Sequence, residues 1–163
     1  MMNILFVCLG NICRSPSAEA VFRGLVQKQG LQQHYRLDSA GTGDWHVGKA
    51  PDPRAIEAAG KRELDLSELR ARQLSAEDFQ AFDAIVVMDD QNFEDVMNIC
   101  PSQSLGKISK LSDYARNPDV RAIDDPYYGD NQGFDRMLDN LEDACAGLLE
   151  RLEVRRQALE DRG

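Results

Sequence analysis

The sequence of 163 residues has no hydrophobic run that approaches the roughly 20 residues that a membrane-spanning helix needs. Its first residues lack the basic leader, the long apolar core and the small-residue cleavage site of a secretory signal. Positive charge is also scarce, because 19 Lys and Arg oppose 28 Asp and Glu, for a formal net charge of -9. Such a chain lacks the broad basic surface that nucleic acids and anionic membranes bind. We therefore expect a cytoplasmic protein that binds neither, and that captures any anionic ligand locally.

Metal-binding patterns are missing as well. The four cysteines stand at positions 8, 13, 100 and 145, and no two of them form a Cys-x-x-Cys pair or another spacing typical of a zinc site. The two histidines, His34 and His46, have no evident Cys or carboxylate partner. We therefore expect no metal and no cofactor, and free thiols in a reducing compartment. The length suits one domain, residues 1–163, whose core needs no disulfide.

Strand-like and helix-like segments alternate along the chain. Apolar runs rich in β-forming residues predict buried strands at 3–8, 35–40 and 83–88, and a weaker strand at 107–111. Helices are predicted from residue 15 to about residue 29, at 54–59, near 76–82 and 92–98, and from residue 133 onward. This order predicts an α/β fold of three layers, with a four-stranded parallel sheet between helices. The ligand site is expected at the carboxyl ends of the strands.

Several polar and sulfur side chains are explained by the predicted helices. Ser15 suits an N-cap, and Pro16 suits the first position of the first helix. Asp89 and Asp90 directly follow the third strand, and we interpret them as caps of the next helix. Cys145 belongs to an apolar stripe of the C-terminal helix, in which residues recur at spacings of three and four. Cys145 is therefore expected in the core.

The loop after the first strand has the features of an oxyanion site. It places the thiol of Cys8 at the end of a buried strand and Arg14 just before a helix. A helix N-terminus offers unpaired backbone N–H groups and a partial positive charge, which together bind phosphate. Gly10 and Asn11 tolerate the left-handed backbone that turns N–H groups toward an anion. Arg14 adds a planar fork for two phosphate oxygens, and these positive surroundings favour the nucleophilic thiolate of Cys8.

A proton donor for a leaving group is predicted in a second loop. Asp125 is followed by Pro126, Tyr127 and Tyr128, in a segment between the fourth strand and the C-terminal helix. The two aromatic side chains can form the wall of a slot for a planar ring, and an Asp beside them can stay protonated. Asp125 would then be the acid that protonates the leaving group and, as a carboxylate, the base that activates water.

The two motifs together carry a resemblance to a known family. The Cys-x5-Arg-Ser pattern near the N-terminus and Asp-Pro-Tyr-Tyr near the C-terminus resemble the low-molecular-weight protein-tyrosine-phosphatase family, and the similarity extends to 39–42, 45–55, 71–73 and 87–89. The resemblance implies hydrolysis of protein phosphotyrosine, and of small aryl phosphates, through a phosphocysteine intermediate. Cys8 would be the nucleophile, Arg14 the phosphate clamp and Asp125 the proton donor. The phosphate would also be bound by Leu9, Gly10, Asn11, Ile12, Cys13 and Ser15.

The resemblance also implies residues for substrate preference, and the position of a second cysteine suggests redox control. Trp45 would face Tyr127 and Tyr128 across the substrate crevice, which favours an aromatic phosphomonoester. Cys13 lies in the same loop as Cys8, so an oxidant could join the two in a disulfide that protects the nucleophile from irreversible oxidation. The enzyme is therefore expected to be redox-sensitive.

A polar network is expected to hold the phosphate loop in shape. By resemblance it would include Ser39 together with Asn11 and Ser15. Many members of the family carry a His that braces the Asn of this loop, and the corresponding position here is Leu69. Because Leu has no hydrogen-bonding side chain, this residue predicts a loop that is less firmly braced.

Four other functions remain open at this point. An arsenate reductase has a similar fold and anion loop but needs further cysteines to relay a disulfide. Phosphoarginine hydrolases that resemble this chain have Thr in place of Ile12 and lack the paired Tyr. The chain could also be a non-catalytic anion sensor, or a phosphocarrier that holds phosphate on Cys8 and passes it on, although such a carrier does not need Arg14 together with Asp125. The expected partner is a tyrosine-phosphorylated protein, with a tyrosine kinase as the opposing enzyme by family analogy, and the chain is expected to be a monomer or a weak dimer.

Overall fold

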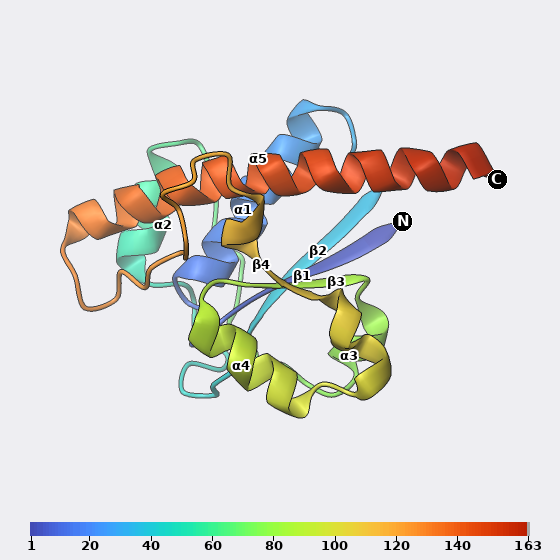
Figure 1. Ribbon diagram of the computed structural model, residues 1–163. Helices are drawn as coiled ribbons and strands as arrows, with labels where there is room; N and C mark the ends of the chain where they lie inside the picture. Colours follow the sequence, from blue (N-terminus) through green and yellow to red (C-terminus); the bar gives the residue numbers. More distant parts are fainter. Residues whose placement is uncertain (163) are drawn as a thin grey trace.

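A four-stranded parallel sheet forms the centre of the molecule (Figure 1). The computed structural model describes residues 1–162, and Gly163, the last residue of the expected domain, lies outside them. The strands, in chain order, are β1 Met2–Cys8, β2 Tyr35–Gly41, β3 Ala84–Val87 and β4 Ile108–Lys110. Their order across the sheet is β2-β1-β3-β4, and every neighbouring pair is parallel. The predicted strands are thus confirmed to within one residue at each end.

Helices cover both faces of this sheet, as the sequence predicted (Figure 1). One face packs against α1 Arg14–Lys28, α2 Pro53–Gly60 and α5 Asn131–Arg162, and the other against α3 Asp78–Ala81 and α4 Asp90–Ile99. Two 3-10 segments, η1 Ser102–Lys107 and η2 Leu111–Tyr114, flank β4 and were not predicted. No helix within residues 1–162 is long and apolar enough to cross a membrane.

The continuous apolar run of β1 reflects its burial on both faces. Ile4 and Phe6 belong to the core cluster shared with α1 and α5, whereas Leu5 and Val7 belong to the cluster shared with α3 and α4. Successive side chains of a strand point to opposite faces, so a strand covered on both sides needs apolar residues at every position. Cys145 lies in the apolar stripe of α5 and is fully buried, as predicted.

The start of α1 differs from the prediction. The helix begins at Arg14, its N-cap is Cys13, and no side chain caps it. Ser15 is therefore inside the helix rather than its cap, and its hydroxyl accepts from the Asn11 amide of the loop and donates to the Ala40 carbonyl oxygen of β2. The consequence is a helix N-terminus whose first N–H groups have no side-chain acceptor, which is the form that an anion can use.

Candidate active site

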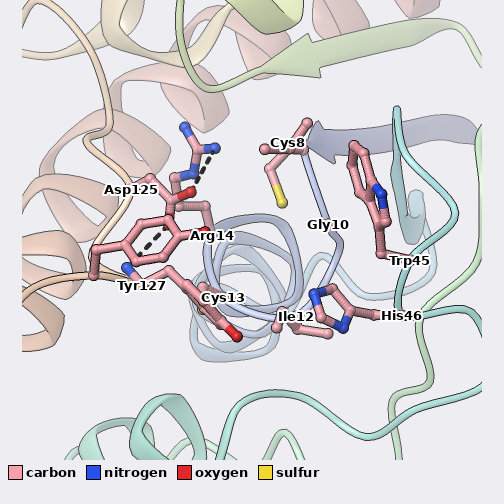
Figure 2. A pocket seen from close by; sticks show the side chains of 11 residues that line it. Cys8, Gly10, Ile12, Cys13, Arg14, Trp45, His46, Asp125 and Tyr127 are labelled. Atoms are coloured by element: carbon pink, nitrogen blue, oxygen red, sulfur yellow. Dashed lines mark hydrogen bonds and ion pairs between the residues drawn. The ribbon is translucent and has the colours of Figure 1, made fainter.

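The predicted phosphate loop lies at the carboxyl end of β1, where the topology opens a crevice. The chain passes from β1 to β2 on one side of the sheet centre and places β3 on the other side. Ligands of open α/β sheets bind at such a switch point. Cys8 is the last residue of β1, Asp89 follows β3 after one residue, and the loop between Cys8 and Arg14 bends over the strand ends (Figure 2).

Cys8 contacts one residue of its own loop and one of α1. Its side chain is 2% exposed, and its sulfur points into the pocket (Figure 2). The backbone N–H of Asn11 donates to the Cys8 Sγ at 3.3 Å, and the Ser15 Oγ lies 3.1 Å from the same sulfur. The Asn11 N–H is the donor in its contact with the sulfur, whereas in the contact between Cys8 and Ser15 either atom can be the donor.

Asn11 is the residue that shapes the loop. Its φ of 57 places it in the left-handed region, as predicted for this position, whereas Gly10 is outside that region. The buried side-chain amide donates to the hydroxyls of Ser15 at 2.7 Å and Ser39 at 3.0 Å, and its oxygen accepts from the backbone N–H of Arg72 at 3.0 Å. The amide is therefore satisfied on both its nitrogen and its oxygen.

Leu69 stands where the family often has a His that braces Asn11, and the structure shows which groups contact Asn11 instead. Leu69 is partly buried and packs against the main core cluster, so it contributes apolar contact at this position. The polar brace on Asn11 comes instead from the backbone of Arg72, three residues further along the chain, and from Ser39 in β2. The weaker bracing predicted from the missing His stays a prediction.

Two glycines allow the loops around the crevice to approach closely. A side chain on Gly41 would place its Cβ 2.9 Å from the Leu9 carbonyl oxygen, so β2 could not end this close to the phosphate loop with a larger residue. A Cβ on Gly10 would lie 3.0 Å from the imidazole of His46. Gly10 therefore serves close packing of His46, in place of the left-handed backbone that was predicted for it.

Arg14 connects the phosphate loop to two acidic residues. Its side chain is almost entirely buried, and its Nη1 donates to Asp89 Oδ2 at 2.6 Å and to the Ile123 carbonyl oxygen at 3.1 Å. Its Nη2 lies 3.5 Å from Asp125 Oδ2. Burial alone would lower the pKa of Arg14, but Cys8, Asp89 and Asp125 together raise it above its ordinary value. The guanidinium is therefore charged at any physiological pH.

Asp89 has a second contact that the sequence did not reveal. It caps α4, as predicted, through its Oδ1, which accepts from the N–H of Asn92 at 2.7 Å. Its other oxygen forms the ion pair with Arg14. Asp90, by contrast, is an exposed residue paired with Lys110. The only sequence signal for the Arg14 contact is that Asp89 follows the strand next to β1.

The second predicted loop lies beside Arg14, across the pocket from Trp45 and His46 (Figure 2). Asp125 accepts the backbone N–H of Tyr127 at 3.1 Å, which closes a tight turn around Pro126. The rings of Tyr127 and Tyr128 meet edge to face, with centroids 4.9 Å apart. Tyr127 is partly buried against the core, whereas Tyr128 is 94% exposed.

Both loops open into one cavity of about 380 Å³. It is lined by Cys8, Leu9, Gly10, Ile12, Cys13, Arg14, Trp45, His46, Asp125, Tyr127 and Tyr128. The predicted supporting residues do not line the cavity: Asn11 is in the loop itself, Ser15 in the first turn of α1 and Ser39 in β2. His46 was not predicted; its ring is 6.3 Å from that of Tyr127. Its position beside Trp45 in a glycine-containing loop was the available signal.

The distant cysteines are not part of this site. Cys100 ends α4 and contacts the core cluster on the far face of the sheet, and Cys145 is fully buried within α5. Burial raises the pKa of the Cys145 thiol, as it does for Cys13 in the phosphate loop. Within residues 1–162, no three His, Cys, Asp or Glu side chains gather in a way that could hold a metal ion.

Comparison with known proteins places the chain in a family. The family model described as low molecular weight phosphotyrosine protein phosphatase matches residues 3–158. A protein of that name from Schizosaccharomyces pombe is 47% identical over 134 residues, which cover 82% of this chain and 85% of the relative. The crystal structure of a protein tyrosine phosphatase from Entamoeba histolytica, with Hepes in the active site, superposes with a TM-score of 0.93 at 40% identity, covering 96% of this chain and 99% of that one. This chain belongs to the low molecular weight phosphotyrosine protein phosphatase family.

Proposed function

We propose that this chain hydrolyses protein phosphotyrosine, and small aryl phosphates, through a phosphocysteine intermediate. The observation that carries the proposal is the convergence of the Cys8 sulfur, the Arg14 guanidinium and the Asp125 carboxyl group on one cavity. A nucleophile, an anion clamp and a proton donor are the groups that phosphoryl transfer to a thiolate requires. The whole chain, residues 1–163, is proposed to act as one phosphatase domain.

In the first step, the thiolate of Cys8 attacks phosphorus. A sulfur–phosphorus bond forms as the bond between phosphorus and the tyrosine oxygen breaks, and Asp125 gives its proton to the departing phenolate. The Asn11 N–H stabilises the thiolate before attack, and the Ser15 hydroxyl does so when its proton turns from the Ala40 carbonyl oxygen to the sulfur. The remaining phosphate-binding residues offer backbone N–H groups of the loop from Leu9 to Ser15.

Arg14 is proposed to hold the transferred group. Because its Nη1 is already occupied by Asp89 and Ile123, its Nε and Nη2 are the nitrogens left to bind two phosphate oxygens. Arg14 thus stabilises the charge spread over the equatorial oxygens in the transition state.

In the second step, Asp125 acts as the base. Its carboxylate removes a proton from water while the water oxygen attacks phosphorus, so that the sulfur–phosphorus bond breaks and the Cys8 thiolate and inorganic phosphate are released. The carboxyl group regains in this step the proton it gave away in the first. The cycle balances without a cofactor.

The walls of the cavity favour an aromatic ester. Trp45, His46 and Tyr127 present ring surfaces around the mouth, with the thiol of Cys8 at its base. A planar ring stacks on such walls, whereas a phosphoserine side chain is too short to reach both wall and base. The proposed partner is a tyrosine-phosphorylated protein, opposed by a tyrosine kinase, and the chain is proposed to act as a monomer or a weak dimer.

The positions of Cys100 and Cys145 argue against an arsenate reductase. That activity needs further thiols to relay a disulfide from the site, and both residues lie outside the cavity, one of them fully buried. The position of Asp125 in the cavity argues against a phosphocarrier, because a carrier does not need a proton donor for a leaving group. The presence of Ile12 in the loop, together with Tyr127 and Tyr128, supports phosphotyrosine over phosphoarginine as the substrate.

The substrate class is tested with phosphopeptides. In the presence of EDTA, the protein is expected to release phosphate from a phosphotyrosine peptide with a kcat/KM at least about 100-fold above that for the matching phosphoserine peptide, because ring stacking is available to one substrate alone. Arsenate with a thiol reductant is expected to remain unreduced. Steady-state phosphate release and arsenite detection measure both, and an inert protein or a preference for phosphoserine would refute the proposed function.

Asp125→Ala is expected to make catalysis depend on the leaving group. On phenyl phosphate, whose phenolate needs a proton, kcat/KM should fall by roughly 100- to 1000-fold, whereas on 2,4-dinitrophenyl phosphate it should fall less than about tenfold, because that leaving group departs as an anion. The matched control is Asp124→Ala, since Asp124 is exposed and outside the cavity. An equal loss on both substrates would remove Asp125 from its role as acid.

We further propose that peroxide joins Cys8 and Cys13. Peroxide oxidises the Cys8 thiolate to a sulfenic acid, and the Cys13 thiol then attacks that sulfur, forming the disulfide and releasing water. Burial, Asp52 and Cys8 raise the pKa of Cys13, so Cys8 is the thiol that oxidises first. Inactivated protein should show a peptide linking the two residues by mass spectrometry and should recover with dithiothreitol. Absence of the linkage, or of recovery, would contradict the switch.

A further inference from the structure

Arg54 links the loop that carries Asp125 to Asp52, a residue that is itself bonded to the phosphate loop. It lies near the start of α2, and its Nη2 donates to the backbone carbonyl oxygen of Tyr127 at 2.9 Å. The same guanidinium forms a two-pronged ion pair with Asp52, through Nε at 3.1 Å and Nη2 at 2.8 Å. One side chain therefore binds two segments that are more than 70 residues apart.

Asp52 in turn is fixed to the phosphate loop. Its backbone N–H donates to the Ile12 carbonyl oxygen at 2.9 Å, and its Oδ1 accepts the N–H of Arg54 at 2.8 Å, which caps α2. The carboxylate is nearly buried, and its hydrogen bonds with Arg54 lower the pKa of Asp52 below its ordinary value. The ion pair therefore stays charged across the working pH range.

Aromatic rings hold the guanidinium of Arg54 in place. Its Cζ lies 5.5 Å from the ring centroid of Tyr127 and 4.8 Å from that of Phe134, which is buried in the first turns of α5. Both distances are within the range of cation–π attraction. Arg54 thus contacts the Tyr127 carbonyl, the Tyr127 ring and the helix that follows the loop.

Other ties between the 124–129 segment and the rest of the protein are few. Among the described residues, hydrogen bonds and ion pairs that leave this segment run from Asp125 to Arg14, at 3.5 Å, and from Tyr127 to Arg54. The bonds of Tyr127 N–H to Asp125 and of Gly129 N–H to Pro126 are internal. If Arg14 turned its Nη2 from Asp125 to a phosphate oxygen, the hydrogen bond from Arg54 to Tyr127 would be the one that still joins this segment to the rest of the described residues.

We propose that Arg54 is a positioning residue for proton transfer: it sets the place of Asp125 relative to the phosphate loop through Tyr127 and Asp52. This proposal rests on the proposed function, since it concerns the acid of that reaction. Misplacing a catalytic group by about 1 Å can cost roughly 100-fold in rate. Loss of Arg54 should therefore appear in the proton-transfer steps and spare reactions that need no acid.

The test compares leaving groups in Arg54→Met, which keeps most of the length of the side chain and removes the charge and its donors. On phenyl phosphate, kcat/KM should fall by about 10- to 100-fold, and on 2,4-dinitrophenyl phosphate by less than about threefold. Arg54→Lys, which keeps the charge but not the fork, should show the same selectivity to a smaller degree. It also serves as the second variant if Arg54→Met does not fold.

The matched control is Arg62→Met. Arg62 follows α2 and pairs with Asp139 and Glu142 of α5, so its loss removes ion pairs of an arginine near the other end of α2, at a distance from the cavity. Both Met variants should lower Tm, but Arg62→Met should leave kcat/KM unchanged on both substrates. This control separates a stabilising role of Arg54 from a positioning role.

A double-mutant cycle completes the test. If Arg54 acts through Asp125, adding Arg54→Met to Asp125→Ala should change kcat/KM on phenyl phosphate by less than about twofold. A uniform loss on both substrates, or effects that multiply in the double variant, would overturn this proposal while an active wild type keeps the proposed function. A wild type that hydrolyses neither aryl phosphate would overturn the proposed function and this proposal with it.

Discussion

Cys8→Ser is expected to lower kcat on a phosphotyrosine peptide by roughly four orders of magnitude or more. A serine hydroxyl fits the same space and can accept the same Asn11 N–H bond, but it stays protonated at neutral pH. Its neighbours, the Ser15 hydroxyl and the loop N–H groups, are arranged to stabilise an anion and are poor proton acceptors. The variant therefore has no activated nucleophile.

Binding and catalysis should separate in this variant. Because the loop amides and Arg14 remain, Cys8→Ser should still bind inorganic phosphate with an affinity within about tenfold of wild type, measured by isothermal calorimetry. The matched control is Cys100→Ser, the same exchange at a partly exposed residue outside the cavity, which should retain full activity. Substantial turnover by Cys8→Ser would exclude the phosphocysteine intermediate.

The elements and the phosphate loop could be predicted because their signals are local. A strand buried on both faces needs a continuous apolar run, and β1 has one between Ile4 and Cys8. The stripe of α5 likewise reports its own buried face, which is why Cys145 could be assigned to the core. In both cases, neighbouring residues of one segment hold all the information required.

Contacts between distant segments were less accessible to prediction. The partner of Arg14, Asp89, is 75 residues away, and its capping of α4 already explained it as a structural residue. The brace on Asn11 comes from a backbone N–H at Arg72, and a backbone donor leaves no mark on residue identity. The contact of Arg54 with the 124–129 segment could not be predicted for a similar reason, since its hydrogen bond goes to the backbone carbonyl oxygen of Tyr127.

Arg14→Lys is the second variant with a very large expected effect, a fall in kcat/KM of roughly 1000-fold. Lysine preserves the positive charge beside Asp89, but its ammonium cannot hold Asp89 and the Ile123 carbonyl with one nitrogen while offering two more to phosphate. The loss should therefore be larger for transition-state binding than for ground-state binding. Inhibition by vanadate, which becomes five-coordinate on binding a nucleophile, should weaken more than inhibition by phosphate.

Arg116→Lys provides the comparison, because Arg116 forms an exposed ion pair with Glu150 and contributes little to stability. It should match wild type in activity and in both inhibition constants. A buried ammonium near Asp89 would keep the ion pair but lose hydrogen bonds, so the Lys variant should be less stable than wild type. Thermal unfolding of Arg14→Lys checks that the variant is still folded. Equal weakening of vanadate and phosphate would assign Arg14 to ground-state binding, because a transition-state clamp must discriminate between the two.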